Sequence, residues 1–146
     1  MKILAAVDLS ESTEKVVKAV EDLAKTLRAE VWLVHIADPE PEFVGLDAGP
    51  QSVRDDTAKV FHDEHRQIQA LADSLREAGV DTTALLLQGA TAEKILDQAA
   101  KLDVDMIVVG SHGRGAMLQM LVGSVSEGVL RKSACPVLVV PTRGRT

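Results

Sequence analysis

Short apolar runs and amphipathic segments alternate along the whole chain. The apolar runs are rich in β-branched residues, as buried strands of a parallel sheet are. They lie at residues 3–7, 31–36, 82–87, 106–109 and 136–140. The segments between them carry apolar residues at helical spacing. These predicted helices lie at residues 11–28, 52–79, 91–102 and 125–132, and residues 37–51, rich in proline, glycine and acid, are expected to form a loop.

This alternation predicts an α/β fold: an open, parallel, five-stranded sheet with helices on both faces, Rossmann-like, with strand order 3-2-1-4-5. No hairpin signal such as Asn-Gly joins two strands. In such sheets the ligand crevice lies at the carboxyl ends of the strands, where the strand order reverses. The rule brings Asp8 and Gly110 side by side, at the ends of the first and fourth strands. Prolines bound the last strand and predict an edge position. We expect one domain over residues 1–146.

Helix boundaries are predicted from capping chemistry. Ser10 or Ser12 is expected to cap the first helix with Glu11 in its first turn, and Ser52 and Thr91 are expected to cap two later helices. The inward stripe of the long helix over 52–79 is expected at Val53, Val60, Phe61, Ile68, Leu71, Ala72 and Leu75.

A strand, a glycine-rich turn and a helix N-terminus follow one another after residue 106. Gly110, Gly113 and Gly115 are closely spaced behind the strand, and Gly123 opens the next helix. Glycines permit close backbone approach. A helix N-terminus offers unpaired N–H groups and positive potential to an anion. The arrangement predicts a phosphate cradle, although a glycine-rich turn that only connects strand and helix is the simpler alternative.

Side chains in this segment add further donors. Ser124 and Ser126 supply hydroxyl groups at the helix N-terminus, and His112 lies between two glycines. For Arg114, contact with phosphate and contact with solvent alone both stay open. Two known cradles are excluded, because the chain has no P-loop motif and residues 113–118 lack the third glycine of the dinucleotide fingerprint.

The spacing Gly110-x2-Gly113-x9-Gly123-Ser124 resembles the nucleotide-binding signature of the universal stress protein family, in the branch that binds ATP. The resemblance covers nearly the whole chain. Residues 2–10 resemble the opening strand of that family, and residues 135–140 resemble its closing strand.

The resemblance also implies which residues contact a nucleotide. From the sequence alone, Asp8 is either a helix cap or a ligand contact; the resemblance implies that it lies by the adenosine. It likewise implies that Ala6, Val7 and Ile36 line the adenine pocket through backbone groups. The remaining implied contacts are Gly110, Ser111, His112, Gly113, Arg114, Gly115, Ala116, Gly123, Ser124, Val125 and Ser126.

Composition narrows the classes of partner. The net charge of −6 opposes a polyphosphate backbone, and the aromatic content of 2% leaves few platforms for base stacking. We therefore expect no nucleic-acid partner. No apolar run approaches the ~20 residues that cross a bilayer, and Asp8 interrupts the first apolar run too early for a signal peptide. The single cysteine, Cys135, excludes an internal disulfide and is expected to be a buried, inert thiol. These features predict a cytoplasmic protein without membrane contact.

Three other features are expected to be structural. His35 interrupts an apolar strand and is interpreted as a hydrogen-bonded core histidine. His62 and His65 share one helix face at a spacing that suits a metal, but no third ligand is evident, so a solvated face is favoured and no metal site is expected. Residues 142–146 are expected to form a frayed tail.

These observations predict a protein that binds ATP, or ADP or AMP, with Mg²⁺, and that reports energy or stress status through an unidentified protein partner. No pair of catalytic acid and base flanks the loop, so no catalytic residue is assigned. The enzyme alternative is slow ATP hydrolysis, with His112 or Ser124 at the γ-phosphate. The third hypothesis is a dimeric scaffold whose pocket is unused. A homodimer through the edge strand Val137–Val140 is expected in any case.

Overall fold

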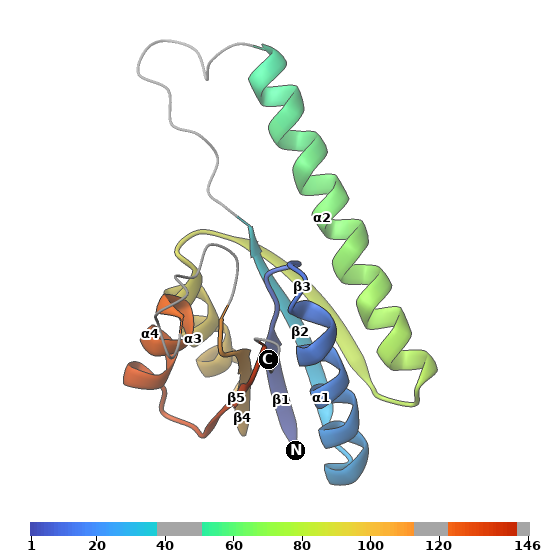
Figure 1. Cartoon of the computed structure of the whole chain (residues 1–146), viewed down its shortest axis with the longest axis vertical. Helices are drawn as coiled ribbons and strands as arrows, with labels where there is room; N and C mark the ends of the chain where they lie inside the picture. Colours follow the sequence, from blue (N-terminus) through green and yellow to red (C-terminus); the bar gives the residue numbers. More distant parts are fainter. Residues whose placement is uncertain (38–50, 113–122, 143–146) are drawn as a thin grey trace, which may run out of the picture.

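The computed structural model describes residues 1–37, 51–112 and 123–142, with residues 51–57 described by their backbone alone. Strands and helices alternate through this part of the chain (Figure 1). The elements are β1 (Lys2–Ala6), α1 (Thr13–Leu27), β2 (Glu30–Ala37), α2 (Gln51–Glu77), β3 (Thr82–Gln88), α3 (Thr91–Leu102), β4 (Met106–Gly110), α4 (Ser124–Lys132) and β5 (Val137–Val140).

The strands form one parallel sheet in the order β3-β2-β1-β4-β5. The predicted fold class and strand order are confirmed, and β5 lies at an edge as its flanking prolines predicted. In the register of the sheet, Ala5 is opposite Val108, and Gly110 is opposite Val140. The chain adds strands on one side of β1 and then crosses to add β4 on the other. The strand order therefore reverses between β1 and β4.

Helices cover both faces of the sheet, and each face has its own apolar cluster (Figure 1). On one face, α1 and α2 pack on the sheet through residues that include Val16, Val20, Ile68, Ala72 and Leu75. On the other, α3 and α4 pack through residues that include Ile95, Ala99 and Val129. Burying two faces of apolar side chains is the main stabilising term for such a sheet.

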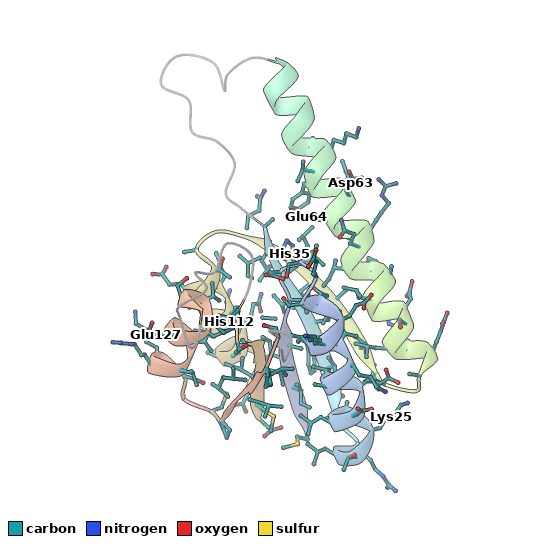
Figure 2. The ribbon with its side chains drawn as sticks, in the orientation of Figure 1. Lys25, His35, Asp63, Glu64, His112 and Glu127 are labelled. Atoms are coloured by element: carbon teal, nitrogen blue, oxygen red, sulfur yellow. The ribbon has the colours of Figure 1, made fainter. Side chains whose placement is uncertain are left out.

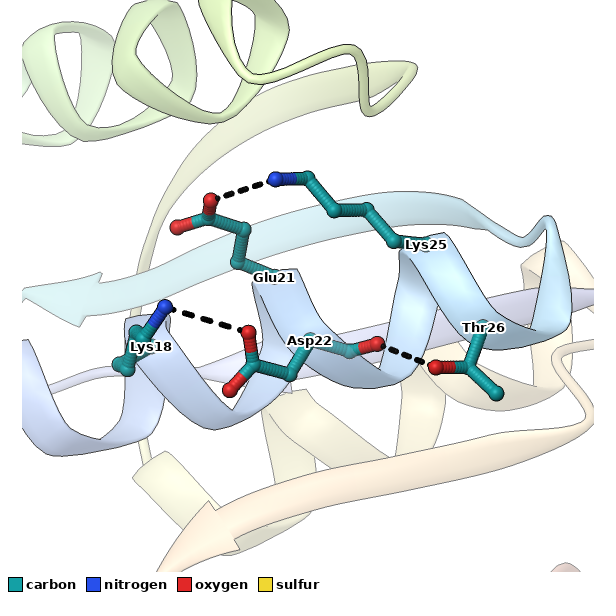
Figure 3. A network of polar contacts seen from close by, with 5 residues as sticks. All are labelled: Lys18, Glu21, Asp22, Lys25 and Thr26. Carbon is teal, nitrogen blue, oxygen red and sulfur yellow. Dashed lines mark hydrogen bonds and ion pairs between the residues drawn. The ribbon is translucent and has the colours of Figure 1, made fainter.

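The charged outer face of α1 carries pairs of side chains at helical spacing (Figure 3). Lys18 Nζ lies 3.2 Å from Asp22 Oδ1, and Lys25 Nζ lies 2.9 Å from Glu21 Oε1. Thr26 Oγ1 donates to the Asp22 carbonyl oxygen at 3.0 Å. The hydrogen bond to Asp22 raises the pKa of the Lys18 ammonium. Exposed pairs of this kind contribute little, so α1 is held mainly by its apolar face.

Several boundary predictions were wrong. Ser12, one of the two predicted caps, does hold the N-cap position of α1, but its hydroxyl makes no capping hydrogen bond. Because α1 begins at Thr13, Glu11 precedes the helix. In α3, Thr91 is the first helical residue and Ala90 holds the capping position. The amino-terminal part of α2 reaches beyond the sheet (Figure 1), and Val60 is 55% exposed rather than inward.

The start of α2 and the burial of Cys135 also differ from the predictions. α2 begins at Gln51, one residue before the expected cap, and residues 38–50 lie outside the described part of the chain. Cys135 is only partly buried. None of the described helices combines the length and the apolar character needed to span a bilayer.

Candidate functional site

The end of β1 and the end of β4 meet at the edge where the strand order reverses. Val7 follows β1 and still belongs to the ladder, because its N–H donates to Val34 O at 2.9 Å. Gly110 ends β4. Since β1 and β4 are neighbours, the chain near Asp8 and the chain near Gly110 lie side by side at this edge, as the sequence predicted.

The turn between β1 and α1 is built around Asp8. Its Oδ1 accepts hydrogen bonds from the Ser10 N–H, at 2.9 Å, and from the Ser10 hydroxyl. Leu9 adopts the left-handed conformation that this tight turn requires, with φ of 60°. The carboxylate thus stabilises the turn ahead of the helix instead of capping the helix itself. This local role leaves the predicted contact with adenosine untested.

A chain of hydroxyl groups joins this turn to the loop after β4. Ser10 Oγ lies 2.8 Å from Ser12 Oγ, and Ser12 Oγ donates to His112 O at 3.4 Å. These hydrogen bonds therefore connect the turn after β1 with the chain after β4, across the boundary between the two strands.

The amino terminus of α4 is bonded to the end of β4. Gly123 N donates to Ser111 O at 2.6 Å, and the Ser126 hydroxyl donates to Gly110 O. These two bonds place the amino terminus of α4 directly beside the end of β4. The Ser126 side chain is buried, and its hydroxyl is used in the hydrogen bond to the Gly110 carbonyl.

The first turn of α4 presents polar groups outward. Gly123 is the extended N-cap residue, with φ of −66°, and Glu127 N donates to Gly123 O at 2.9 Å. The N–H groups of residues 124–126 precede the first such bond and have no acceptor within the helix. Ser124 and Val125 are exposed. Such a helix end attracts an anion through its N–H groups and its dipole.

Gly110 is required by close packing. A Cβ at this position would lie 2.9 Å from Thr142 Cγ2 and 3.3 Å from Val16 Cγ2. The predicted contact residues Gly113, Arg114, Gly115 and Ala116 are outside the described residues, as is the rest of 113–122.

Thr142 was missed by the sequence analysis, which placed it in a frayed tail. It is buried, and its Oγ1 accepts from His112 N at 3.1 Å and donates to His112 O at 2.9 Å. Its own N–H donates to Ser111 Oγ at 3.0 Å. Lys15 Nζ also donates to Thr142 O, at 3.0 Å. The sequence did hold one signal for this role. Thr142 is a hydroxyl residue that follows the apolar run 136–140, and the strand formed by that run ends at the same edge of the sheet as β4, which Ser111 follows.

The residues expected around adenine divide between the two cores. Val7 is packed in the cluster beneath α1 and α2, and Ile36 in the cluster beneath α3 and α4. Ala6 is partly buried at the end of β1. The side chains of Val7 and Ile36 are buried, and the Val7 N–H and carbonyl are already bonded to Val34 O and His35 Nδ1. The adenine contacts expected of these residues stay a prediction.

His35 is a hydrogen-bonded core histidine, as predicted. Its Nδ1 lies 2.9 Å from Val7 O and its Nε2 lies 3.0 Å from Glu64 Oε2 (Figure 2). His62 and His65 are exposed on α2. Among the described residues, no three His, Cys, Asp or Glu side chains gather as a metal site would require.

Comparison with known proteins bears on what this edge does. The model of the universal stress protein family matches residues 1–141. The chain belongs to the universal stress protein family. Universal stress protein MJ0531 of Methanocaldococcus jannaschii is 33% identical over 141 residues, which make up 95% of this chain and 81% of that protein. Membership confirms the resemblance carried by the glycine spacing and places the chain among stress-response proteins.

Solved structures agree with the fold. The structure of universal stress protein MJ0577, from the same organism, has a TM-score of 0.83 at 32% identity and covers 99% of this chain and 97% of its own. A universal stress protein solved in complex with cAMP has a TM-score of 0.72 at 22% identity, covering 98% of both chains. The second likeness is one of fold alone.

Proposed function

We propose that this protein binds an adenine nucleotide, ATP above all, at the β1–β4 edge and acts as a nucleotide-dependent regulator in the stress response. The observation that carries the proposal is the hydrogen bond from Gly123 N to Ser111 O. It sets the positive end of α4 beside the end of β4, across from Asp8. An anion-binding helix end facing a carboxylate is the arrangement that a nucleotide's phosphate and ribose hydroxyl groups need.

In the proposed complex the phosphates lie against the first turn of α4 and the segment from Gly110 to Ser126, and Mg²⁺ neutralises part of their charge. The adenosine lies toward Asp8, where a carboxylate accepts hydrogen bonds from ribose hydroxyls. A protein of this fold is known in complex with cAMP, which supports the choice of an adenine nucleotide. A protein partner then distinguishes the nucleotide-bound protein from the nucleotide-free protein.

The test places a negative charge where the phosphates are proposed. Ser124→Asp puts an acid in the first turn of α4, where an acid favours the helix, so the fold is retained while phosphate is repelled. Thr91→Asp is the matched control, because Thr91 is the first residue of α3 as Ser124 is of α4. Equilibrium dialysis with ATP and Mg²⁺ is expected to give a dissociation constant raised about tenfold or more in Ser124→Asp and unchanged in Thr91→Asp.

The nucleotide itself is identified by mass after the freshly purified protein is denatured, and again after loading with ATP and Mg²⁺. Intact ATP that persists supports a binding regulator. ADP that accumulates with time, and that is lost in His112→Ala, supports the slow hydrolase instead. A wild-type protein that stays empty at millimolar ATP refutes nucleotide binding and leaves the dimeric scaffold.

The second part of the proposal is a homodimer through β5. This strand lies at the edge of the sheet, and Leu138 is 39% exposed. An apolar edge strand offers unpaired backbone groups to another strand. Pairing with the same strand of a second copy around a two-fold axis satisfies those groups and covers the apolar surface.

A further inference from the structure

A buried imidazole links α2 to the turn that carries Asp8. His35 comes from β2, and its side chain is 7% exposed. Its two ring nitrogens contact Val7 O and Glu64 Oε2, at 2.9 and 3.0 Å (Figure 2). Glu64 comes from α2, and its side chain is 17% exposed. Three elements therefore meet at one ring.

The chemistry of the partners fixes how the ring is held. A carbonyl oxygen only accepts hydrogen bonds, so His35 Nδ1 carries a proton and donates to Val7 O. Glu64 holds the opposite nitrogen, so the ring cannot turn away from Val7 without losing its partner on α2. A carboxylate behind a histidine commonly fixes the orientation of the ring.

The held carbonyl belongs to the peptide that joins Val7 to Asp8. The Val7 N–H is also held, by Val34 O. Both bonds run to β2, so this residue is fixed on both sides just before the chain leaves the sheet. The Asp8 carboxylate then anchors the next turn through Ser10. The direction in which Asp8 leaves β1 thus depends on the His35 ring, and the ring depends on Glu64.

We propose that Glu64 and His35 are positioning residues for the nucleotide site. Neither touches the ligand; they hold the Val7–Asp8 peptide in the orientation that binding requires, and they make that orientation depend on the placement of α2. The inference rests on the proposed function, because it assigns Asp8 to the adenosine. It adds a residue of α2 to the residues that shape the site.

The test uses Glu64, because its side chain is partly exposed and belongs to neither apolar cluster. Glu64→Ala removes the group that orients the ring. Glu64→Gln keeps an oxygen and an N–H₂ group at the same place and preserves a hydrogen bond to Nε2. Arg76→Ala is the matched control, because Arg76 Nε donates to Thr82 O at 2.8 Å and also ties α2 to the sheet, through β3.

Two readouts are combined. The first is the dissociation constant for ATP with Mg²⁺. It is expected to rise about tenfold in Glu64→Ala, the effect of one lost hydrogen bond of typical strength, to return close to wild type in Glu64→Gln, and to stay unchanged in Arg76→Ala. The second is the set of backbone amide NMR signals of Asp8 and Ser10 in the ligand-free protein, which are expected to shift in Glu64→Ala alone.

The two proposals fail in different ways. A wild-type protein that binds no ATP refutes the proposed function, while the ligand-free amide signals still test whether Glu64 positions Asp8. Glu64→Ala with wild-type affinity and unmoved Asp8 and Ser10 signals overturns the inference. Equal loss of affinity in Glu64→Ala and Arg76→Ala also overturns it, since general loosening of α2 then explains both.

Discussion

Gly110 has no room for a side chain. Its missing Cβ would lie 2.9 Å from Thr142 Cγ2, closer than two carbon atoms pack without displacement. We expect Gly110→Ala to lower the free energy of unfolding by about 1–3 kcal/mol, the usual cost of overpacking, and to weaken ATP binding by pushing Thr142 away from His112. Urea denaturation measures the first effect and equilibrium dialysis the second.

The steric cause of this effect has its own control. Thr142→Ser removes Cγ2 and keeps the hydroxyl that bonds His112. In that background Gly110→Ala is expected to cost distinctly less. An equal loss in both backgrounds would rule out the contact with Thr142 as the cause.

Individual residues also show what the sequence could predict and what it could not. Asp8 and Gly110 were expected side by side because strand ends follow from the apolar runs and from the rules of parallel sheets. Thr142 was missed because its role consists of bonds to residues 30 and 31 positions earlier. Composition pointed to a frayed end, and only the position of β5 beside β4 gives the Thr142 hydroxyl its partners.

Among the elements, apolar spacing predicts the inward face of α1 through most of its length. Val16, Val17 and Val20 are buried, while Leu27, the last residue of the helix, has the same spacing and is 39% exposed. Val60 of α2 follows the same spacing and is exposed, because periodicity shows which face is apolar but not how far the sheet extends beneath it. Ser12 holds the predicted N-cap position of α1, although its hydroxyl bonds to His112 O instead of to the helix, while α2 and α3 begin slightly earlier than predicted.

The edge strand β5 carries a prediction about assembly. Ile107 N donates to Pro136 O and Ser111 N donates to Val140 O. The backbone N–H and C=O groups of the even-numbered residues of β5 therefore point toward β4. By the alternation of a strand, Val137 and Val139 turn their N–H groups outward. We expect wild-type protein to sediment as a dimer at micromolar concentration and Val139→Pro to sediment as a folded monomer, because proline removes an outward donor that the strand pairing uses.

Val139→Ala is the control for this experiment. It trims the side chain but keeps the N–H, so the dimer is expected to persist. A wild-type monomer, or a Val139→Pro dimer of unchanged affinity, would argue against pairing through β5. Sedimentation velocity distinguishes these cases, and circular dichroism checks that each variant is folded.

At the scale of the whole molecule, the proposed nucleotide spans two parts of the fold. One part is β1–β3 with α1 and α2, and the other is β4–β5 with α4. They meet along the β1–β4 ladder and through further contacts, such as those of Ser12 with His112 and of Lys15 with Thr142. A ligand that touches Asp8 on one side and the first turn of α4 on the other adds a bridge between them. It stabilises only the folded state, by about 2.7 kcal/mol at a hundredfold excess over its dissociation constant.

Hydrogen exchange locates that stabilisation. The amides in the first turns of α3 and α4 lack acceptors within their helices and exchange early. With ATP and Mg²⁺ bound, exchange is expected to slow markedly at residues 124–126 and around Asp8, while the first turn of α3 keeps its rate. Equal slowing in both turns would mean that ATP acts on overall stability from a different place. No slowing around Asp8, with protection confined to α4, would indicate that phosphate alone is held and that the adenosine lies outside the β1–β4 edge.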